Sequence, residues 1–186
     1  MKPLQTNRLL LRPFQMEDLY DFYAYAKHPE VGPNAGWKPH ASIDESREIL
    51  KTFLENEEVN AIVLKETGRV VGSIGLHSDR LSHEGMGPCR EVGYVLAQDC
   101  WGRGLMTEAV RRIEQYAFEE IGLACLSVAH FPFNMRSKRV IEKCGFRYEK
   151  TLTGSYIDYR GIPLDEVCYI ITRKDYTRLL CKESGG

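Results

Sequence analysis

The chain has 186 residues, of which 43% are hydrophobic, so it is long enough to bury one sizeable core. Its 25 basic and 26 acidic residues nearly cancel, which excludes a global field for a nucleic-acid or membrane partner and leaves any anion site local. The longest apolar run before Arg12 and Pro13 is too short for a signal peptide or a membrane span. We expect a single domain over residues 1–186.

Six cysteines occur without a C-x-x-C pair and without the histidine spacing of a zinc site. This pattern favours reduced thiols in a cytoplasmic protein that holds no metal. The positions are Cys89, Cys100, Cys125, Cys144, Cys168 and Cys181.

The first half of the chain mixes strands and helices. A strand over 8–12 ends at Pro13, and apolar residues at helical spacing predict a helix over 16–27. Three prolines and two glycines in 28–40 indicate an ordered surface loop. Ser42 and Glu45 form a capping-box pattern before a helix that ends near Asn56. Two β-branched runs, 61–64 and 70–76, predict a hairpin.

The second half continues the alternation after a polar loop at 78–88. Strands are expected over 91–97 and 123–131, and helices over 105–121 and 134–143, with Gly145 as a left-handed C-terminal cap. A closing hairpin is expected over 146–158 and 164–172, followed by a mixed basic and acidic end from Lys174 with little apolar content. The order predicts an α/β protein with a largely antiparallel sheet and crossover helices.

The stretch QDCWGRGLMTEAV, residues 98–110, places a Gly-Arg-Gly turn between an apolar strand and an amphipathic helix. A helix N-terminus carries unpaired N–H groups and partial positive charge, so a turn without side chains in front of it suits an anion. A plain tight turn is the alternative. Thr107 stands where a dinucleotide fingerprint needs its third glycine, and no Gly-Lys-Ser or Gly-Lys-Thr triplet supports a Walker A loop.

Three segments together carry a family resemblance: NRLLLRPF, EVGYVLAQDCWGRGLMTEAV and NMRSKRVIEKCGFRYE. In this order, from about residue 6 to about residue 173, they resemble the GNAT superfamily of N-acetyltransferases, specifically its ribosomal-protein alanine N-acetyltransferase-like branch. The resemblance implies the GNAT fold, with a mixed, mostly antiparallel sheet of six to seven strands, a splayed central strand pair and flanking helices. It also implies acetyl-CoA as the acyl donor.

The resemblance assigns the donor site by position. The main chain of the central strand would pair with pantetheine, and the amides of the turn and first helical residues would hold the pyrophosphate. Asn134 would contact pantetheine, a role compatible with a helix cap, and Ser137 would lie near the phosphates. The remaining residues implied are Tyr94, Val95, Leu96, Gly102, Arg103, Gly104, Leu105, Met106 and Thr107.

The catalytic groups are less clear. The tyrosine that many relatives use as general acid falls on Ile141. Glu91 opens the cofactor-facing strand and is our expected general base, although a solvated strand-end glutamate is the alternative. His77 and His130 are the other candidate bases, because the ordinary pKa of an imidazole lies near neutral pH. An attacking α-amine, with a pKa of about 7.7–8.0, needs less help than a lysine amine near 10.4.

A covalent route through a cysteine is not expected. Cys100 and Cys144 have no recognisable base partner, so we interpret them as core thiols.

The loop at 28–40 is the expected source of acceptor contacts, with Trp37 and His40 as a flat apolar face and a polar handle. Three tyrosines, Tyr156, Tyr159 and Tyr169, are candidates for the opposite wall, although tyrosines are also common in strands.

The expected function is acetyl transfer to a primary amine by direct attack in a ternary complex, in a monomer or homodimer. That amine would be a protein N-terminal α-amine or a small-molecule amine. A backbone N–H of the central strand would stabilise the oxyanion. The alternatives are a non-catalytic acyl-CoA-binding sensor and a pure interaction module.

Overall fold

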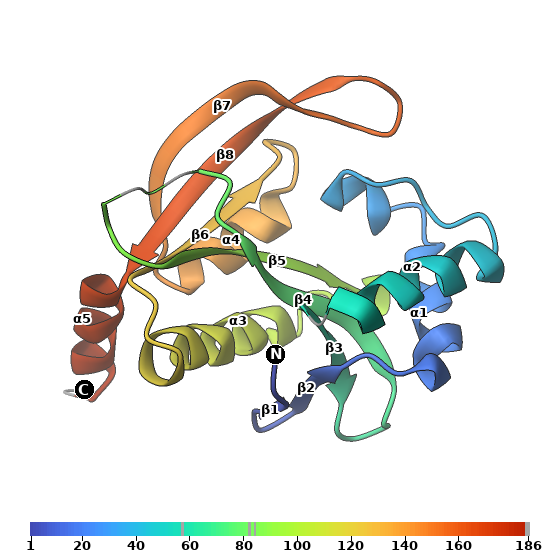
Figure 1. The fold of residues 1–186 in the computed structure, drawn as a ribbon, viewed down its shortest axis with the longest axis horizontal. Helices are drawn as coiled ribbons and strands as arrows, with labels where there is room; N and C mark the ends of the chain where they lie inside the picture. The colour runs from blue at the N-terminus through green and yellow to red at the C-terminus, as the bar shows by residue number, and fades with distance from the viewer. Residues whose placement is uncertain (57, 82, 84, 185–186) are drawn as a thin grey trace.

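The computed structural model describes residues 1–56, 58–81, 83 and 85–184, with the backbone alone for 182–184. Residues 82 and 84 of the loop expected at 78–88, and residues 185–186 of the expected domain, lie outside the described residues. One sheet of order β1-β2-β3-β4-β5-β6-β8-β7 runs through the molecule (Figure 1). Its strands are β1 (Leu4–Gln5), β2 (Leu9–Pro13), β3 (Val59–Leu64), β4 (Val70–Ser78), β5 (Cys89–Leu96), β6 (Cys125–His130), β7 (Arg147–Ile157) and β8 (Pro163–Thr172).

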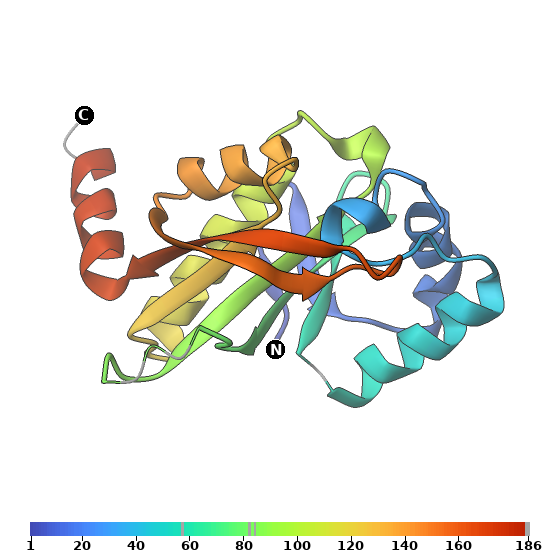
Figure 2. The same ribbon diagram turned by 90° about the horizontal axis from the view of Figure 1, so that it is seen from above.

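Helices cover both faces of this sheet (Figures 1 and 2). The two that follow the central strands, α3 and α4, pack together on one face, while α1 and α2 pack together on the other. None of the helices in the described part of the chain is long and apolar enough to cross a membrane. The helices are α1 (Leu19–Ala26), α2 (Ile43–Asn56), α3 (Leu105–Gln115), α4 (Met135–Lys143) and α5 (Arg173–Ser184), with short 3₁₀ turns η1 (Met16–Asp18), η2 (Gly32–Ala35) and η3 (Gln98–Cys100) and a π-helical turn η4 (Tyr116–Glu120) after α3.

The central strands β5 and β6 form the parallel pair of the sheet and then diverge. In the described residues their register consists of three pairs, Cys89 with Cys125, Arg90 with Leu126, and Glu91 with Ser127. From Val92 to Leu96, β5 pairs with β4 along one edge, and its other edge makes no pairs with β6 in the described residues. This opens a gap between β5 and β6. The splayed pair implied by the resemblance is therefore present, and the fold class is confirmed.

Two differences from the expected elements have physical causes. The sheet has eight strands, because the two-residue β1 pairs with β2 at its edge. The last residues form helix α5 although they carry few apolar side chains. Two of these, Tyr176 and Leu179, are three positions apart and pack on the core, where the Tyr176 ring stacks on Phe118 at 5.0 Å.

The cysteines correct one expectation. Cys89 and Cys125 form a disulfide, contrary to our expectation of six reduced thiols. They lie 36 positions apart in sequence and become neighbours through the parallel register of β5 and β6, a contact that residue spacing does not reveal. Among the other four, Cys100, Cys144 and Cys168 are buried thiols and Cys181 is an exposed one.

Candidate active site

A cavity of about 400 Å³ lies where β5 diverges from β6, between the start of α3 and the helix α4. It is lined by the second half of β5, the glycine turn, the first turn of α3 and one side of α4. Most of the expected donor-site residues line it, namely Tyr94, Val95, Leu96, Gly102, Gly104, Leu105, Met106, Thr107, Asn134 and Ser137. The structure thus brings together residues that span more than forty positions of sequence.

The glycine turn presents backbone to this cavity. Gly102 and Gly104 both have φ of +75°, the left-handed region in which a side chain is strained. Gly104 is the N-cap of α3, and no described side chain caps it. Glu108 N donates to Gly104 O at 3.1 Å, which is the first i to i−4 hydrogen bond of α3. The backbone N–H groups before Glu108 come ahead of this series of helical hydrogen bonds. This arrangement suits an anion at the positive end of the helix.

Basic side chains of α4 also line the cavity, and they were not among the residues expected from the sequence. Arg136, Arg139 and Lys143 line the same cavity. The Arg136 guanidinium lies 4.3 Å from the ring centre of Trp101. The three cations follow one another at spacings of three and four residues, which places them on one face of α4. That periodicity could have identified them from the sequence.

The expected Arg103 behaves differently. It does not line the cavity within the described part of the chain, and its carbonyl accepts a hydrogen bond from Arg8 Nη1 at 2.9 Å.

Two side chains connect the walls of this first cavity, which we call the donor cavity after its expected ligand. Asn134 caps α4, since its Oδ1 accepts from Ser137 N at 3.1 Å, and its Nδ2 donates to Asn34 O at 3.0 Å. Tyr94 Oη lies 2.8 Å from Ser137 Oγ, and burial raises the pKa of Tyr94 although this hydrogen bond opposes the rise. Ile141 is buried in the core. The helix-cap role of Asn134 is therefore present, and its contact with pantetheine stays a prediction.

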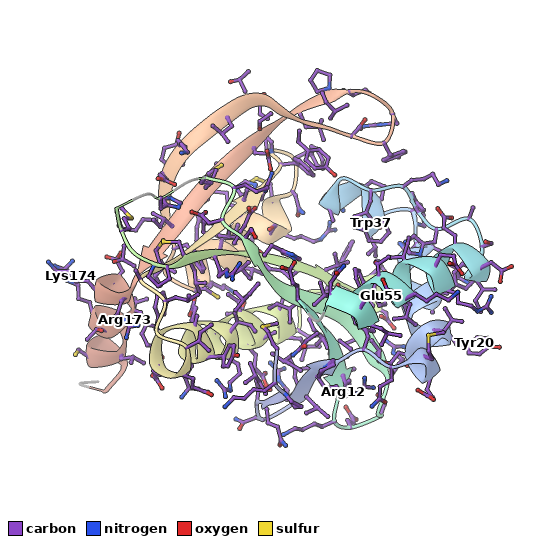
Figure 3. All side chains as sticks on the ribbon, viewed as in Figure 1. Arg12, Tyr20, Trp37, Glu55, Arg173 and Lys174 are labelled. Atoms are coloured by element: carbon purple, nitrogen blue, oxygen red, sulfur yellow. A yellow bond between two sulfur atoms is a disulfide. The ribbon has the colours of Figure 1, made fainter. Side chains whose placement is uncertain are left out.

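A second cavity of about 500 Å³ lies on the other face of β5, and we call it the acceptor cavity after the amine expected there. Aromatic side chains dominate its wall. It contains the two expected acceptor residues, Trp37 and His40, and Figure 3 shows Trp37 between the η2 segment and α2. Its remaining lining is Phe22, Tyr25, Ala35, Lys38, Glu45, Ile49, Phe53, Val59, Ser73, His77, Gly93, Tyr94 and Val95. Ala35, Tyr94 and Val95 line both cavities, so the two cavities share a wall near the end of β5.

His40 helps to hold the loop at 28–40 in place. Its Nδ1 lies 2.7 Å from Ser46 Oγ, and its backbone N donates to Ala26 O at 3.1 Å. Burial lowers the pKa of His40. A buried neutral imidazole packed 5.2 Å from the Trp37 ring gives the acceptor cavity an ordered wall.

His77 lies over the backbone of β5 in the acceptor cavity. A Cβ added at Gly93 would lie 3.0 Å from His77 Nε2, and one added at Gly75 would lie 2.9 Å from it. The two glycines therefore leave the space that the imidazole occupies. Nδ1 of the ring pairs with Glu58 Oε2 at 3.4 Å. Nε2 is thus held over Gly93, next to Tyr94 and Val95.

Glu91, the expected base, is engaged elsewhere. Its carboxylate accepts from Arg80 Nε at 2.8 Å and from Arg80 Nη2 at 2.6 Å, and Arg80 also binds Glu166 at 2.9 Å. These hydrogen bonds raise the pKa of Arg80, so its guanidinium stays charged at neutral pH. Glu91 is buried and is absent from the described lining of both cavities.

The other nucleophile and base candidates are packed. His130 Nδ1 lies 2.8 Å from Phe131 O, and its ring packs 5.6 Å from Tyr169. Cys100 and Cys144 are both buried, and burial raises their pKa, which disfavours a reactive thiolate.

The β7–β8 hairpin reaches across to the loop at 28–40 (Figure 2). Tyr156 Oη donates to Gly36 O at 3.3 Å, and its ring lies 5.1 Å from Phe131. Of the other two tyrosines considered for this wall, Tyr169 is buried against His130 and Tyr159 is exposed. The hairpin thus contacts the acceptor loop through Tyr156.

Fold and site together define an α/β protein with a splayed strand beside two cavities, one of which is lined by the glycine turn and the N-terminus of α3. Residues 8–147 match the family model described as an acetyltransferase (GNAT) domain, so the chain belongs to the GNAT acetyltransferase family. Membership implies acetyl transfer from acetyl-CoA.

Relatives agree with this assignment. The chain is 27% identical to the uncharacterized N-acetyltransferase YoaA of Bacillus subtilis, over 91% of this chain and 96% of YoaA. It is 32% identical to the putative ribosomal N-acetyltransferase YdaF of the same organism, over 59% of this chain and 57% of YdaF. The resemblance to the GNAT superfamily is thereby confirmed.

Solved structures share the fold. A GNAT-family acetyltransferase from Bacillus anthracis superposes with a TM-score of 0.81 at 22% identity, over 93% of this chain and 99% of that one. The microcin C7 self-immunity acetyltransferase MccE, solved with acetyl-CoA and AMP, superposes with a TM-score of 0.75 at 18% identity, over 90% and 93% of the two chains.

Proposed function

We propose that this protein transfers the acetyl group of acetyl-CoA to a primary amine, by direct attack while both substrates are bound. The amine is a protein N-terminal α-amine or the amine of a small molecule. The observation that carries the proposal is that Ala35, Tyr94 and Val95 line both cavities. A thioester on one side of β5 and an amine on the other would approach each other there.

The donor cavity offers what coenzyme A requires. The amides around Gly102–Thr107 and the cations of α4 would hold the phosphates. The open edge of β5 at Tyr94–Leu96 offers main-chain groups to pantetheine. A backbone N–H of the same segment would stabilise the oxyanion formed on attack. The cavity fits an extended ligand with an anionic end.

The contacts favour His77 over Glu91 as the general base. A base must reach the amine directly or through one water. His77 lines the acceptor cavity with Nε2 held over Gly93, whereas the Glu91 carboxylate is occupied by Arg80. Glu91 as the base therefore stays a prediction, and the pair of variants described below separates the two residues.

The leaving thiolate needs less help than the amine. A thiol with a pKa near 8.5 is a tolerable leaving group at neutral pH, so a tyrosine at position 141 is not essential to the proposed reaction. Ile141 instead fills the core beneath α4.

Binding and turnover provide separate tests of the function. Acetyl-CoA at 100 times its dissociation constant should stabilise the protein by about 2.7 kcal/mol, which is measured as a thermal shift. Release of free thiol should then be followed across a panel of α-amino peptides and small amines. Thiol release that requires an amine supports the transferase.

The other outcomes contradict the proposal in different ways. Stabilisation without release for any amine would identify the acyl-CoA sensor instead. No stabilisation by acetyl-CoA would leave the glycine turn as a plain turn.

A further inference from the structure

A cluster of three metal-ligand residues lies at the closed end of the splayed strands, away from the proposed catalytic groups. Cys89 starts β5, Cys125 starts β6, and His83 comes from the loop before β5. One ligand atom from each of the three lies within 4.8 Å of the others. The disulfide joins the two sulfurs, and the imidazole lies beside it.

His83 is oriented by a carboxylate. Its side chain is 4% exposed, and its Nδ1 lies 2.7 Å from Asp79 Oδ2. Asp79 is itself fixed, because it accepts from His83 N at 3.0 Å and from Ser127 Oγ at 2.9 Å. An imidazole whose one nitrogen donates to a carboxylate is the usual arrangement of a metal-binding histidine.

A fourth donor lies next to the same imidazole. His83 Nε2 is 3.1 Å from both Oε1 and Oε2 of Glu149, a residue of β7. Two sulfurs and one imidazole nitrogen therefore converge from the loop before β5 and the strands β5 and β6, and a carboxylate of β7 lies beside the imidazole. Sulfur and imidazole donors in fourfold coordination are the set that Zn²⁺ selects.

We propose that the reduced protein binds Zn²⁺ through Cys89, Cys125 and His83, with Glu149 as the fourth ligand and Asp79 as the positioning residue. A dithiol reductant supplies two electrons and two protons to the disulfide and is itself oxidised to a disulfide. The two thiols then lose their protons as the metal binds. A two-electron oxidant such as an organic disulfide reverses the process and releases Zn²⁺.

The site has a structural consequence for the fold. Both forms, the disulfide and the metal, link β5 to β6 at the first of their three register pairs. The closed end of the splay is therefore linked in both redox states. The proposal concerns a structural site, and it holds or fails independently of acetyl transfer.

Co²⁺ and Zn²⁺ alone are the probes of this site. The full chain, reduced and freed of excess reductant, is titrated with Co²⁺, and the thiolate-to-metal absorption band is recorded. Zn²⁺ affinity is measured by competition with a chromophoric chelator. We expect one ion per chain in the reduced protein and none in the disulfide form. We expect Asp79→Asn to lower the affinity about 10- to 100-fold.

Three substitutions and one control localise the metal. Cys89→Ser and His83→Gln should abolish the thiolate band or lower the affinity at least tenfold, and Cys125→Ser should do the same where circular dichroism shows it folded. Cys181→Ser, which removes an exposed thiol outside the cluster, should bind Zn²⁺ like the parent. A reduced parent protein without the band, or Cys89→Ser with the affinity of the parent, would overturn the proposal.

Discussion

The donor and acceptor cavities share three lining residues, but backbone groups form much of one cavity and side chains form most of the other. The donor cavity depends on backbone, namely the glycine turn, the first amides of α3 and the open edge of β5. The acceptor cavity depends on side chains from α1, the loop at 28–40, α2 and β4. Backbone recognition leaves a short local motif in the sequence, whereas a side-chain wall assembled from distant elements leaves none.

The largest expected effect is the loss of the general base in the acceptor cavity. We expect His77→Gln to lower kcat/KM about 10²- to 10⁴-fold, the usual contribution of general base catalysis, with little change in acetyl-CoA affinity. Thiol-release assays measure this loss, and calorimetric titration measures the acetyl-CoA affinity. Glu91→Gln is the comparison, and a greater loss of activity there than in His77→Gln would reassign the base to Glu91.

The glycine turn should dominate donor binding. Gly104→Val places a side chain in a left-handed residue, at about 1–2 kcal/mol, and obstructs the amides of α3. We expect acetyl-CoA affinity to fall about tenfold or more, because each 1.4 kcal/mol is tenfold. Calorimetric titration measures the affinity. The matched control is Gly68→Val, which has φ of +72° in a hairpin turn outside the site and should bind acetyl-CoA normally.

The cations of α4 should contribute less, and in a salt-dependent way. Arg139→Ala removes one of three basic side chains from the donor cavity, so we expect about tenfold weaker acetyl-CoA binding at low ionic strength and a smaller difference at high salt. An acetyl-pantetheine thioester without phosphates should show no difference between the parent and this variant. An equal loss for both donors would place Arg139 outside phosphate recognition.

The acceptor wall should respond selectively. Trp37→Ala removes an aromatic face from the second cavity, and we expect KM for the amine to rise several-fold while the acetyl-CoA dissociation constant changes little. Steady-state kinetics with each substrate varied in turn measures both. A change confined to acetyl-CoA would show that the second cavity does not hold the acceptor.

The smallest expected effect concerns the anchoring of α3. Glu108 accepts from Arg8 N at 2.9 Å and Arg8 Nε at 2.6 Å. Burial opposes ionisation, but hydrogen bonds from Thr6 and Arg8 outweigh it and lower the pKa of Glu108. Its stabilisation is therefore full above the unfolded pKa of about 4.3 and is lost as pH falls through the folded pKa.

We expect Glu108→Gln to lower the free energy of unfolding by about 1–2 kcal/mol at pH 7 and by less at pH 4. Urea unfolding at both pH values measures this. The matched control is Glu48→Gln, which removes an exposed i,i+3 pair with Lys51 and should change stability little. An equal effect of Glu108→Gln at both pH values would contradict the assigned role.

The same contrast explains what the sequence predicted. Most of the elements followed from periodicity and capping patterns, and the resemblance gave the splayed strands and most of the residues that line the donor cavity. The position of His77 over Gly75 and Gly93, the Arg80 pair with Glu91, and the contact of Cys89 with Cys125 all depend on strand register. Register arises from tertiary packing, so residue type alone could suggest His77 but could not choose it over Glu91.

The loop at 32–36, which contains η2, borders both cavities. Asn34 receives a hydrogen bond from Asn134 on the donor side, Gly36 receives one from Tyr156 of the hairpin, and Ala35 between them lines both cavities. We therefore expect a substitution that reshapes this loop for a new amine to change acetyl-CoA affinity as well. Attempts to redirect this enzyme will need compensating changes in α4 or β7, and single substitutions in the loop will trade one substrate against the other.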